Sequence, residues 1–435
     1  MINQDDLKRQ LSRRQVLKLG GGLIGLGALS TILPKSLLQP TKVVNAAERM
    51  QITTPNLHFA ASDGWIYLPD PAVPPYHPDN MAPPLLTTYI FGFRNVTGLT
   101  DQQVFAQKMK VQLSAPIWWI DQEEDFTLKI TNLGLQIRPD LIDAHTLHFH
   151  GFRQAIPIFD GEPHSSVGVP ISRDLTYFYR PHDPGTYMYH CHFEETEHVH
   201  MGMVGIVFVR PLLDQAHPGR RFCYNDESTE FDREFTFMLN EIWTFAHWCD
   251  SHVQLPEWSD YQPDFWMLNG RTYPDTIAPP GGGTDSGPGG TGDLIAPPGR
   301  PELQYQPISS LVKCNEGDRV LLRFANLGYE EQSMRMTGVP MRLVGRDATL
   351  LRGRDGTDMT YMTDTVIIGP GESADAIFVA PDVTPDDGLD YKRFFLYNRN
   401  ANRISNGGAP GYGGQMTEVH VYPAGTLPPQ TEPNT

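Results

Sequence analysis

The 435-residue sequence is poor in cysteine and in positive charge. Its four cysteines are too few for a dense disulfide framework. Lysine and arginine total 34 and aspartate and glutamate total 51, which gives a formal net charge of −17. An acidic surface repels the phosphate backbone of nucleic acids, so nucleic-acid binding is not expected. Beyond residue 47, no apolar run is long enough to cross a bilayer.

The first 47 residues are typical of an export signal. Arg13 and Arg14 precede a small and apolar run, Leu19–Leu33, and Val44–Ala47 supplies small residues for cleavage. The run is about 15 residues long, shorter than the roughly 20 that a membrane span needs. The paired arginines resemble those of a twin-arginine signal. We therefore predict that residues 1–47 are removed and that the protein is exported, to the periplasm or outside the cell.

Turn-forming residues are abundant in the rest of the chain. The sequence holds 40 glycines and 38 prolines, which favours short strands and turns over long helices. Segments such as Leu86–Phe93, Asp125–Thr131 and Val204–Arg210 are short and rich in β-branched and aromatic residues. Short strands between regular turns predict an all-β fold of sandwich or barrel type.

An internal repeat indicates two copies of one fold. Asp125–Gly134 and Asp318–Gly328 each combine an acidic residue, an apolar strand and the triplet Asn-Leu-Gly. The expected organisation is domain one over 48–211, a polar linker over 212–232, domain two over 233–425, a flexible glycine- and proline-rich insertion over 277–302, and a tail over 426–435.

Histidines are concentrated between residues 145 and 200. Nine of the fifteen fall in this stretch, and seven of them stand in two compact groups. The groups are His145-Thr-Leu-His148-Phe-His150-Gly151, and His190-Cys191-His192 followed by His198-Val-His200-Met-Gly-Met203. Single buried histidines are usually structural, but two groups this close around a cysteine indicate a metal site.

Strand periodicity predicts which of these side chains meet. Alternate residues of a strand share a face, so His148 and His150 lie on one side, as do His190 and His192. Cys191 then points the other way, where His145 can approach from a turn. Four imidazoles on one face suit copper, iron or zinc, whereas a thiolate with two imidazoles and a distant thioether suits a blue-copper site.

These motifs resemble those of the multicopper oxidases, a family of cupredoxin-fold proteins. The matching segments are His145-x-x-His148-x-His150-Gly151, Asp160-Gly161, Gly185–His192 and Gly202–Arg210. The resemblance implies two cupredoxin-like Greek-key domains and copper as the cofactor. It also implies that His145, Cys191, His198 and Met203 bind a type 1 copper, and that His148, His150, His190 and His192 belong to a second copper centre.

The sequence departs from the family pattern in two places. The step from Cys191 to His198 is seven residues, against the family's usual five, and His200 lies in the same loop and competes as a ligand. The five-residue step from His198 to Met203 favours His198. In domain two, the stretches that correspond to the family's other histidines carry none. They are Gln332–Gly338 and Tyr397–Asn400, with Gln332, Arg335, Thr337, Asn398 and Asn400 at the relevant positions.

The expected function is an exported copper oxidoreductase that oxidises a donor one electron at a time. Phenols, metal ions and a redox protein all remain candidate donors, and O2 is a candidate acceptor. A homo-oligomer is expected, because one chain carries only half of an oxygen-reducing cluster. The alternatives are a non-catalytic blue-copper electron-transfer or copper-handling protein and an enzyme similar to copper nitrite reductases.

Overall fold

The computed structural model describes residues 55–70, 75–153, 155–287 and 289–435. The predicted signal at residues 1–47 lies outside this range, so its export role stays a prediction. Residues 55–435 form one compact unit, and the domain boundaries predicted from the sequence stay predictions. Within the described residues, no helix has the length and apolar character needed to cross a membrane.

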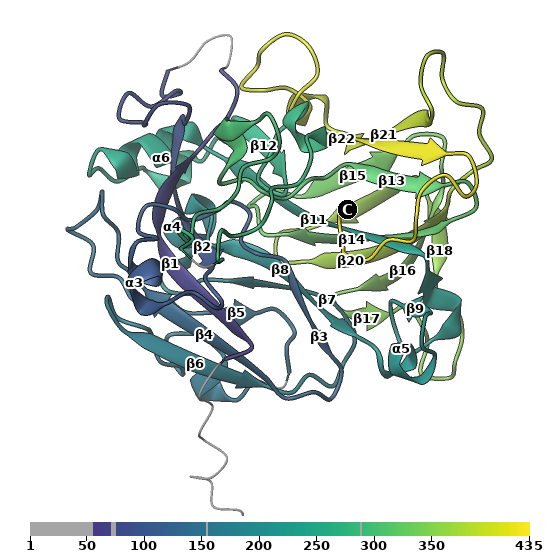
Figure 1. The fold of residues 1–435 in the computed structure, drawn as a ribbon, viewed down its shortest axis with the longest axis horizontal. Helices are drawn as coiled ribbons and strands as arrows, with labels where there is room; N and C mark the ends of the chain where they lie inside the picture. The colour runs from purple at the N-terminus through teal and green to yellow at the C-terminus, as the bar shows by residue number, and fades with distance from the viewer. Residues whose placement is uncertain (1–54, 71–74, 154, 288) are drawn as a thin grey trace, which may run out of the picture. The chain divides into compact units, whose positions relative to one another are not determined.

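Strands dominate the described part of the chain, which confirms the predicted all-β class (Figure 1). The strands of the first half are β1 (Leu57–Ile66), β2 (Thr88–Asn95), β3 (Trp118–Asp121), β4 (Phe126–Asn132), β5 (His148–Phe149), β6 (Asp174–Tyr179), β7 (Gly185–His190) and β8 (Val204–Arg210). The short pair β9 (Arg221–Phe222) and β10 (Glu230–Phe231) follows. The helices are α3 (Asp101–Phe105), α4 (Glu195–Met201), α5 (Leu212–Ala216) and α6 (Thr244–Ser251).

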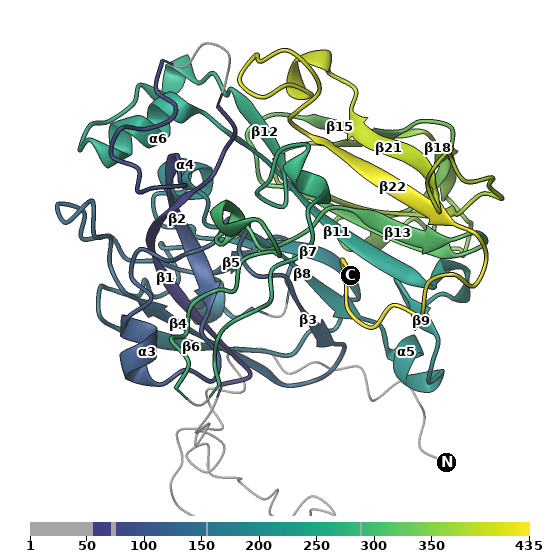
Figure 2. The ribbon, with the colours of Figure 1, turned by 45° about the horizontal axis from the view of Figure 1, so that its top comes forward.

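Besides α6, the second half consists of strands and short 3-10 turns (Figure 2). Its strands are β11 (Arg233–Ile242), β12 (Phe265–Leu268), β13 (Val312–Asn315), β14 (Arg319–Asn326), β15 (Gln332–Met336), β16 (Met341–Arg346), β17 (Thr349–Leu350), β18 (Tyr361–Thr363), β19 (Thr365–Ile368), β20 (Ser373–Val379), β21 (Lys392–Asn398) and β22 (Met416–Tyr422).

Each half is built from two sheets. The first half has the sheets β2-β1-β4-β6 and β3-β8-β7-β5, and the second has β12-β11-β14-β20-β16-β17 and β13-β22-β21-β15-β19. Each pair of sheets encloses its own apolar core, the first around aromatic rings such as Phe59, Trp118 and Tyr189 and the second around Phe237, Phe324 and aliphatic side chains. The repeated strands also pair alike, because β4 runs parallel to β1 as β14 runs parallel to β11.

A buried charge cluster joins the two halves. The guanidinium of Arg323 on β14 donates to Glu234 on β11 at 3.1 Å and to the Thr186 hydroxyl on β7 at 3.0 Å. Thr186 in turn donates to Asp375 on β20, which also accepts the Tyr224 hydroxyl. Arg323 and Glu234 have no exposed side-chain surface, and Arg323 also packs over the ring of Phe208 on β8. Polar groups from both halves therefore bond one buried arginine, through its Nε and Nη1.

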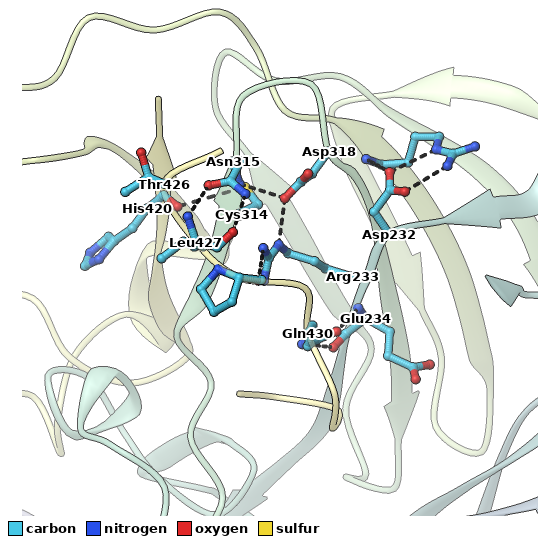
Figure 3. Close-up of polar contacts among 12 residues, drawn as sticks. Asp232, Arg233, Glu234, Cys314, Asn315, Asp318, His420, Thr426, Leu427 and Gln430 are labelled. Carbon is cyan, nitrogen blue, oxygen red and sulfur yellow. Dashed lines mark hydrogen bonds and ion pairs between the residues drawn. The ribbon is translucent and has the colours of Figure 1, made fainter. Parts of the chain in front are cut away.

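The C-terminal segment lies along the edge of the second half. Leu427 exchanges hydrogen bonds with the Asn315 side chain, and Arg233 donates both to Asp318 and to the Pro428 carbonyl (Figure 3). Gln430 pairs with the backbone N–H and carbonyl of Glu234. Asn434 does the same with Thr236, two residues further along β11. The residues predicted as a tail thus cover β11 through side-chain amides.

The glycine- and proline-rich segment 277–302 is held by contacts with the first half of the chain. Gln103 of α3 donates to the Gly290 carbonyl at 2.8 Å, and Lys110 forms an ion pair with Asp293 at 2.5 Å. The buried Arg94 donates to the carbonyl of Gly292. These polar contacts fix several points of a segment that has little secondary structure of its own.

Candidate copper centres

The short strand β5 and the end of β7 bring four histidines together. His148 of β5 is the register partner of His190 of β7. The ring of His148 lies 5.7 Å from that of His150, 5.3 Å from His190 and 4.8 Å from His192. Gly161 lies against β5, where a Cβ atom would stand 2.1 Å from the Leu147 carbonyl oxygen, so only glycine allows this close approach. The four imidazoles thus share one side of the strand pair.

Helix α4 brings His198 back to Cys191. The chain turns sharply at Glu194, whose φ of 47° is left-handed, and the helix ends at Gly202 with a φ of 121°. The Met203 N–H donates to the His198 carbonyl, and the Cys191 N–H donates to the Met203 carbonyl. The segment between Cys191 and Met203 therefore contains a helix, which accommodates the seven-residue step from Cys191 to His198.

Group one consists of His145, Cys191 and His198. The Cys191 sulfur lies 3.3 Å from His198 Nδ1 and 3.7 Å from His145 Nδ1. All three side chains have no exposed surface, and their ligand atoms lie within 4.8 Å of one another. Met203 is also fully buried and belongs to the same apolar cluster as Cys191. A thiol and two imidazoles have therefore been brought together out of contact with water.

The two imidazoles of group one differ in their electrostatic surroundings. Burial, together with the neighbouring His198, lowers the pKa of His145 well below its usual value, and its Nε2 has no hydrogen-bond partner in the described residues. Burial also acts to lower the pKa of His198, but Cys191 and the Asp143 carboxylate outweigh it and raise that pKa to about 10. Asp143 lies 3.4 Å from His198 Nε2 and so orients the ring through the nitrogen that faces away from Cys191.

Group two consists of His148, His150 and His190. Each ring uses Nδ1 for a hydrogen bond with a backbone carbonyl: Asp160 at 2.7 Å, Gly371 at 3.0 Å and Cys191 at 2.8 Å, respectively. Because a carbonyl only accepts, Nδ1 of each ring must carry the proton, and Nε2 of each neutral ring is left with a lone pair. Gly371 precedes β20, so the second half of the chain orients His150.

The free nitrogens of group two face one another. His150 Nε2 and His190 Nε2 are 3.0 Å apart, and burial together with the nearby His150 lowers the pKa of His190 to about 3. Two unprotonated nitrogens at this distance repel each other unless a cation lies between them. The separation is compatible with one ion about 2.0 Å from each nitrogen. His192 lies beside the group, with its ring 5.4 Å from that of His190, and its Nδ1 has no hydrogen-bond partner.

A depression of about 520 Å³ opens beside group two, and we call it the histidine groove. The first half lines it with His150, His190, His192, Glu195, Thr196 and Val199, and the second half with Leu327, Gly328, Tyr329, Pro370 and Gly371. The lining residues from the second half include no histidine, cysteine or carboxylate. Group two is therefore open to small molecules, whereas group one is closed.

The positions singled out in the second half are engaged in other interactions. Asn398 donates to Gln332 and to Gln415, at 2.8 Å in each case, and all three amides are buried. Arg335 forms an ion pair with Asp364 at 3.0 Å, and Thr337 bonds the Tyr397 hydroxyl. Amides, an arginine and a threonine, all engaged in other contacts, thus occupy the positions that correspond to the family's other histidines.

His200, the competing ligand, points away from group one. Its Nε2 accepts the Trp243 N–H at 3.1 Å, and its ring packs against Trp258, Tyr261 and Tyr329. All four cysteines, Cys191, Cys223, Cys249 and Cys314, lie in the described part of the chain and are free.

Comparison with known sequences adds a family to this geometry. Residues 111–213 match the multicopper oxidase family, and this segment contains every residue of both groups. Residues 111–213 belong to the multicopper oxidases. Copper is the cofactor that this family implies. No curated protein sequence matches the chain.

Solved structures of copper enzymes share the fold of this chain well beyond residues 111–213. The blue copper oxidase of Nitrosomonas europaea is 20% identical, with 84% of this chain and 85% of that chain covered and a TM-score of 0.56. The multicopper oxidase mgLAC is 20% identical, with 86% and 87% covered and a TM-score of 0.55. The copper nitrite reductase of Nitrosomonas europaea is 13% identical, with 86% and 95% covered and a TM-score of 0.50. These similarities establish the cupredoxin-like fold.

The residues of both groups fit copper. Group one offers a sulfur and two imidazole nitrogens, a donor set suited to copper. Group two offers three imidazoles whose backbone hydrogen bonds aim their free nitrogens at one point. Sequence reasoning did not identify Asp143 or the Gly371 carbonyl as partners of these histidines. No sequence motif marks either of these two partners. The helix α4, in contrast, has ordinary sequence signals, because acidic residues stand ahead of it and Gly202 follows it.

Proposed function

We propose that the chain is an exported copper oxidoreductase that transfers single electrons between a donor at its surface and the histidine groove. His145, Cys191 and His198 would hold a type 1 copper, with Met203 as a weak fourth ligand. His148, His150 and His190, with His192, would hold copper at a second centre. Copper bound there supplies reversible one-electron oxidation and reduction.

One observation carries the proposal: His190 of group two and Cys191 of group one are neighbours in the chain. A single peptide unit therefore connects a buried thiol site with an open imidazole site, and the His190 ring also bonds the Cys191 carbonyl at 2.8 Å. The closed site excludes water from the thiolate, while the histidine groove admits a small acceptor. In this arrangement group one would transfer electrons without contact with water, and group two would react with the acceptor in the histidine groove.

The nature of the acceptor depends on how many imidazoles surround the second centre. Three histidines from the first half line the groove and His148 lies beside them, whereas the lining residues from the second half include no histidine. Full reduction of O2 takes four electrons. In the multicopper oxidases that this sequence resembles, the oxygen-reducing cluster lies between two domains and is held by about eight imidazoles. We propose that this chain alone has an incomplete oxygen-reducing cluster. A homo-oligomer, most simply a trimer, would place a second copy against the groove, and mass measurement in solution tests this.

Copper content and colour test the proposal. Purified protein is expected to bind at least two coppers per chain and to absorb strongly in the visible region through thiolate-to-copper charge transfer. Cys191→Ser should abolish this absorption while circular dichroism shows an intact β fold. The matched control is Cys314→Ser, which replaces another buried and free cysteine far from both groups in the sequence and should keep the colour. A copper-loaded wild type without the absorption would overturn the assignment of group one.

The copper count also distinguishes the alternative of a non-catalytic electron-transfer protein. Such a protein needs group one alone. One copper per chain, and an unchanged copper content in His148→Ala, would therefore support this alternative. We expect His148→Ala to remove copper from the second centre and to leave the visible absorption of group one in place.

A further inference from the structure

A chain of aromatic rings extends from the histidine groove toward solvent. Tyr329 lines the groove. Its ring lies 5.3 Å from that of Tyr261, which lies 5.8 Å from Trp243, and Trp243 lies 6.1 Å from Trp258. Trp258 is partly exposed and is followed by the exposed Ser259 and Asp260. We call these four residues the aromatic chain. Tyrosine and tryptophan are the side chains most easily oxidised by one electron without a metal.

The aromatic chain also contacts the helix that carries His198. The Tyr329 hydroxyl donates to carbonyls of Glu195 and Thr196 at the start of α4. His200, near the end of α4, packs against Tyr329, Tyr261 and Trp258, with ring separations between 5.3 and 5.8 Å. The rings therefore form a continuous path from the copper-binding region to the surface.

Tyr261 differs from the other phenol in its hydrogen-bond acceptor. Its hydroxyl donates to Glu241 Oε1 at 3.0 Å. Glu241 is 1% exposed and also accepts the backbone N–H groups of Tyr329 and Glu330 and the side chain of Gln332. A carboxylate can take up a proton, whereas the carbonyls that bond Tyr329 cannot. Oxidation of a phenol is much easier when its proton has an acceptor, so Tyr261 is the favoured site for a radical.

We propose that Tyr261 is a redox-active tyrosine, with Glu241 as its proton acceptor, that relays oxidising equivalents between the histidine groove and Trp258. In this step Tyr261 gives one electron to a one-electron oxidant, either an oxidised copper ion held at the histidine groove or, in the test below, a ruthenium(III) complex. Its O–H bond breaks, and the proton bonds to Glu241 Oε1. The oxidant is reduced by one electron, and the phenoxyl radical is refilled by an electron from Trp243 and a proton from Glu241.

The inference rests on the proposed function only for the natural source of the oxidising equivalents, and its test does not use copper. The full chain, freed of metal by a chelator so that no Cu(II) signal overlaps, is oxidised by a photogenerated ruthenium(III) polypyridyl complex. At about pH 8.5, which lies above the pKa of about 7 that burial gives Glu241, the carboxylate is ionised and can accept the proton. Ring-deuterated tyrosine distinguishes tyrosyl from tryptophanyl radicals by electron paramagnetic resonance.

A persistent tyrosyl signal is expected in the wild type after the radicals of surface tyrosines have decayed. Tyr261→Phe should lose it and Tyr329→Phe should keep it, a matched pair because both rings lie in the aromatic chain. Glu241→Gln, which keeps the size and removes the proton acceptor, should replace the tyrosyl signal with a tryptophanyl one. Circular dichroism confirms that each variant is folded. Persistence of the full signal in Tyr261→Phe, or an unchanged signal in Glu241→Gln, would overturn the proposal.

A failure of this test leaves the copper proposal intact, since the visible absorption of Cys191 does not depend on Tyr261. Conversely, if the protein does not bind copper at group one, the radical signal in metal-free protein still tests the Tyr261–Glu241 pair.

Discussion

At the scale of single residues, the two histidines of α4 have different roles although they are two positions apart. His198 Nδ1 faces the Cys191 sulfur, whereas His200 Nε2 accepts a backbone N–H. The side chains of residues two apart on a helix point to different sides. The helix therefore separates an imidazole that faces Cys191 from one that belongs to the aromatic packing.

The first prediction compares these residues by substitution. His198→Ala should remove most of the visible absorption of copper-loaded protein, because group one loses one of its two imidazoles. His200→Ala should retain most of it. Absorption spectra at equal copper content measure the effect. The opposite result would assign the ligand to His200 and require a different course of α4 in the copper-bound protein.

The second prediction concerns pH and the buried Glu241. Burial is the main cause that raises its pKa from 4.5 to about 7. The folded state therefore binds this proton more tightly than the unfolded state does, which stabilises the fold below pH 4.5, and the stabilisation is lost as the pH rises through about 7. The shift corresponds to roughly 3 kcal/mol at most.

Measurement requires the difference between two proteins, because Asp250 and Asp264 have raised pKa values too. Between about pH 4 and pH 8, the free energy of unfolding of the wild type should fall by roughly 3 kcal/mol more than that of Glu241→Gln. Urea unfolding at several pH values gives both curves. Parallel curves would show that Glu241 has an ordinary pKa.

At the scale of elements, the sequence predicted the features that depend on neighbouring residues and did not predict those that depend on packing between distant segments. The alternation of His148 with His150, and of His190 with His192, is a property of two strands, and it anticipated the shared face of the four imidazoles. The helical ligand loop, the Asp143 partner and the Gly371 carbonyl depend on how separate segments pack. Packing between distant segments leaves no periodic signal in a single sequence.

The C-terminal segment illustrates the same limit. Asn434 was expected to belong to a tail, yet its amide bonds both backbone groups of Thr236 and the Ser309 carbonyl. Its φ of 59° is left-handed, a conformation that asparagine tolerates better than most residues. A short segment of prolines and polar residues has no periodic pattern that would predict that two of its amides bind along β11.

The third prediction follows from this segment. Asn434→Ala should lower the free energy of unfolding by about 1–3 kcal/mol, because the buried N–H and hydroxyl of Thr236 lose their acceptor. Thr426→Ala is the matched control, since its exposed hydroxyl bonds only the nearby Pro423 carbonyl. It should change stability by less than about 0.5 kcal/mol. Equal urea midpoints for both variants would mean that the segment contributes no stability.

At the scale of the whole molecule, function depends on what faces the histidine groove. The second half supplies backbone to it but no imidazole among its lining residues, and the amides of Gln332 and Asn398 are bonded to each other instead. One chain therefore presents half of the imidazoles that the family's oxygen-reducing cluster uses.

The fourth prediction is that copper-loaded protein consumes O2 with a phenolic donor far more slowly than a complete oxidase, while the colour of group one still bleaches and returns reversibly. Oxygen uptake with the copper per chain counted provides the measurement. Rapid uptake with three or more coppers per chain would show that the missing ligands come from elsewhere, and the oligomer would be the place to search.

The buried Arg323 has a consequence for how the chain can be divided. Its partners come from β11 in the second half and from Thr186 in the first, and Thr186 also ties Asp375 to the same cluster. Cutting the chain between the halves would leave Arg323 with Glu234 and Asp375 but would remove the Thr186 hydroxyl, a hydrogen-bond partner of a charged group that is typically worth about 1.5–3 kcal/mol. We therefore expect the two sandwiches to melt in one transition, and two separate transitions in a calorimetric scan would contradict this.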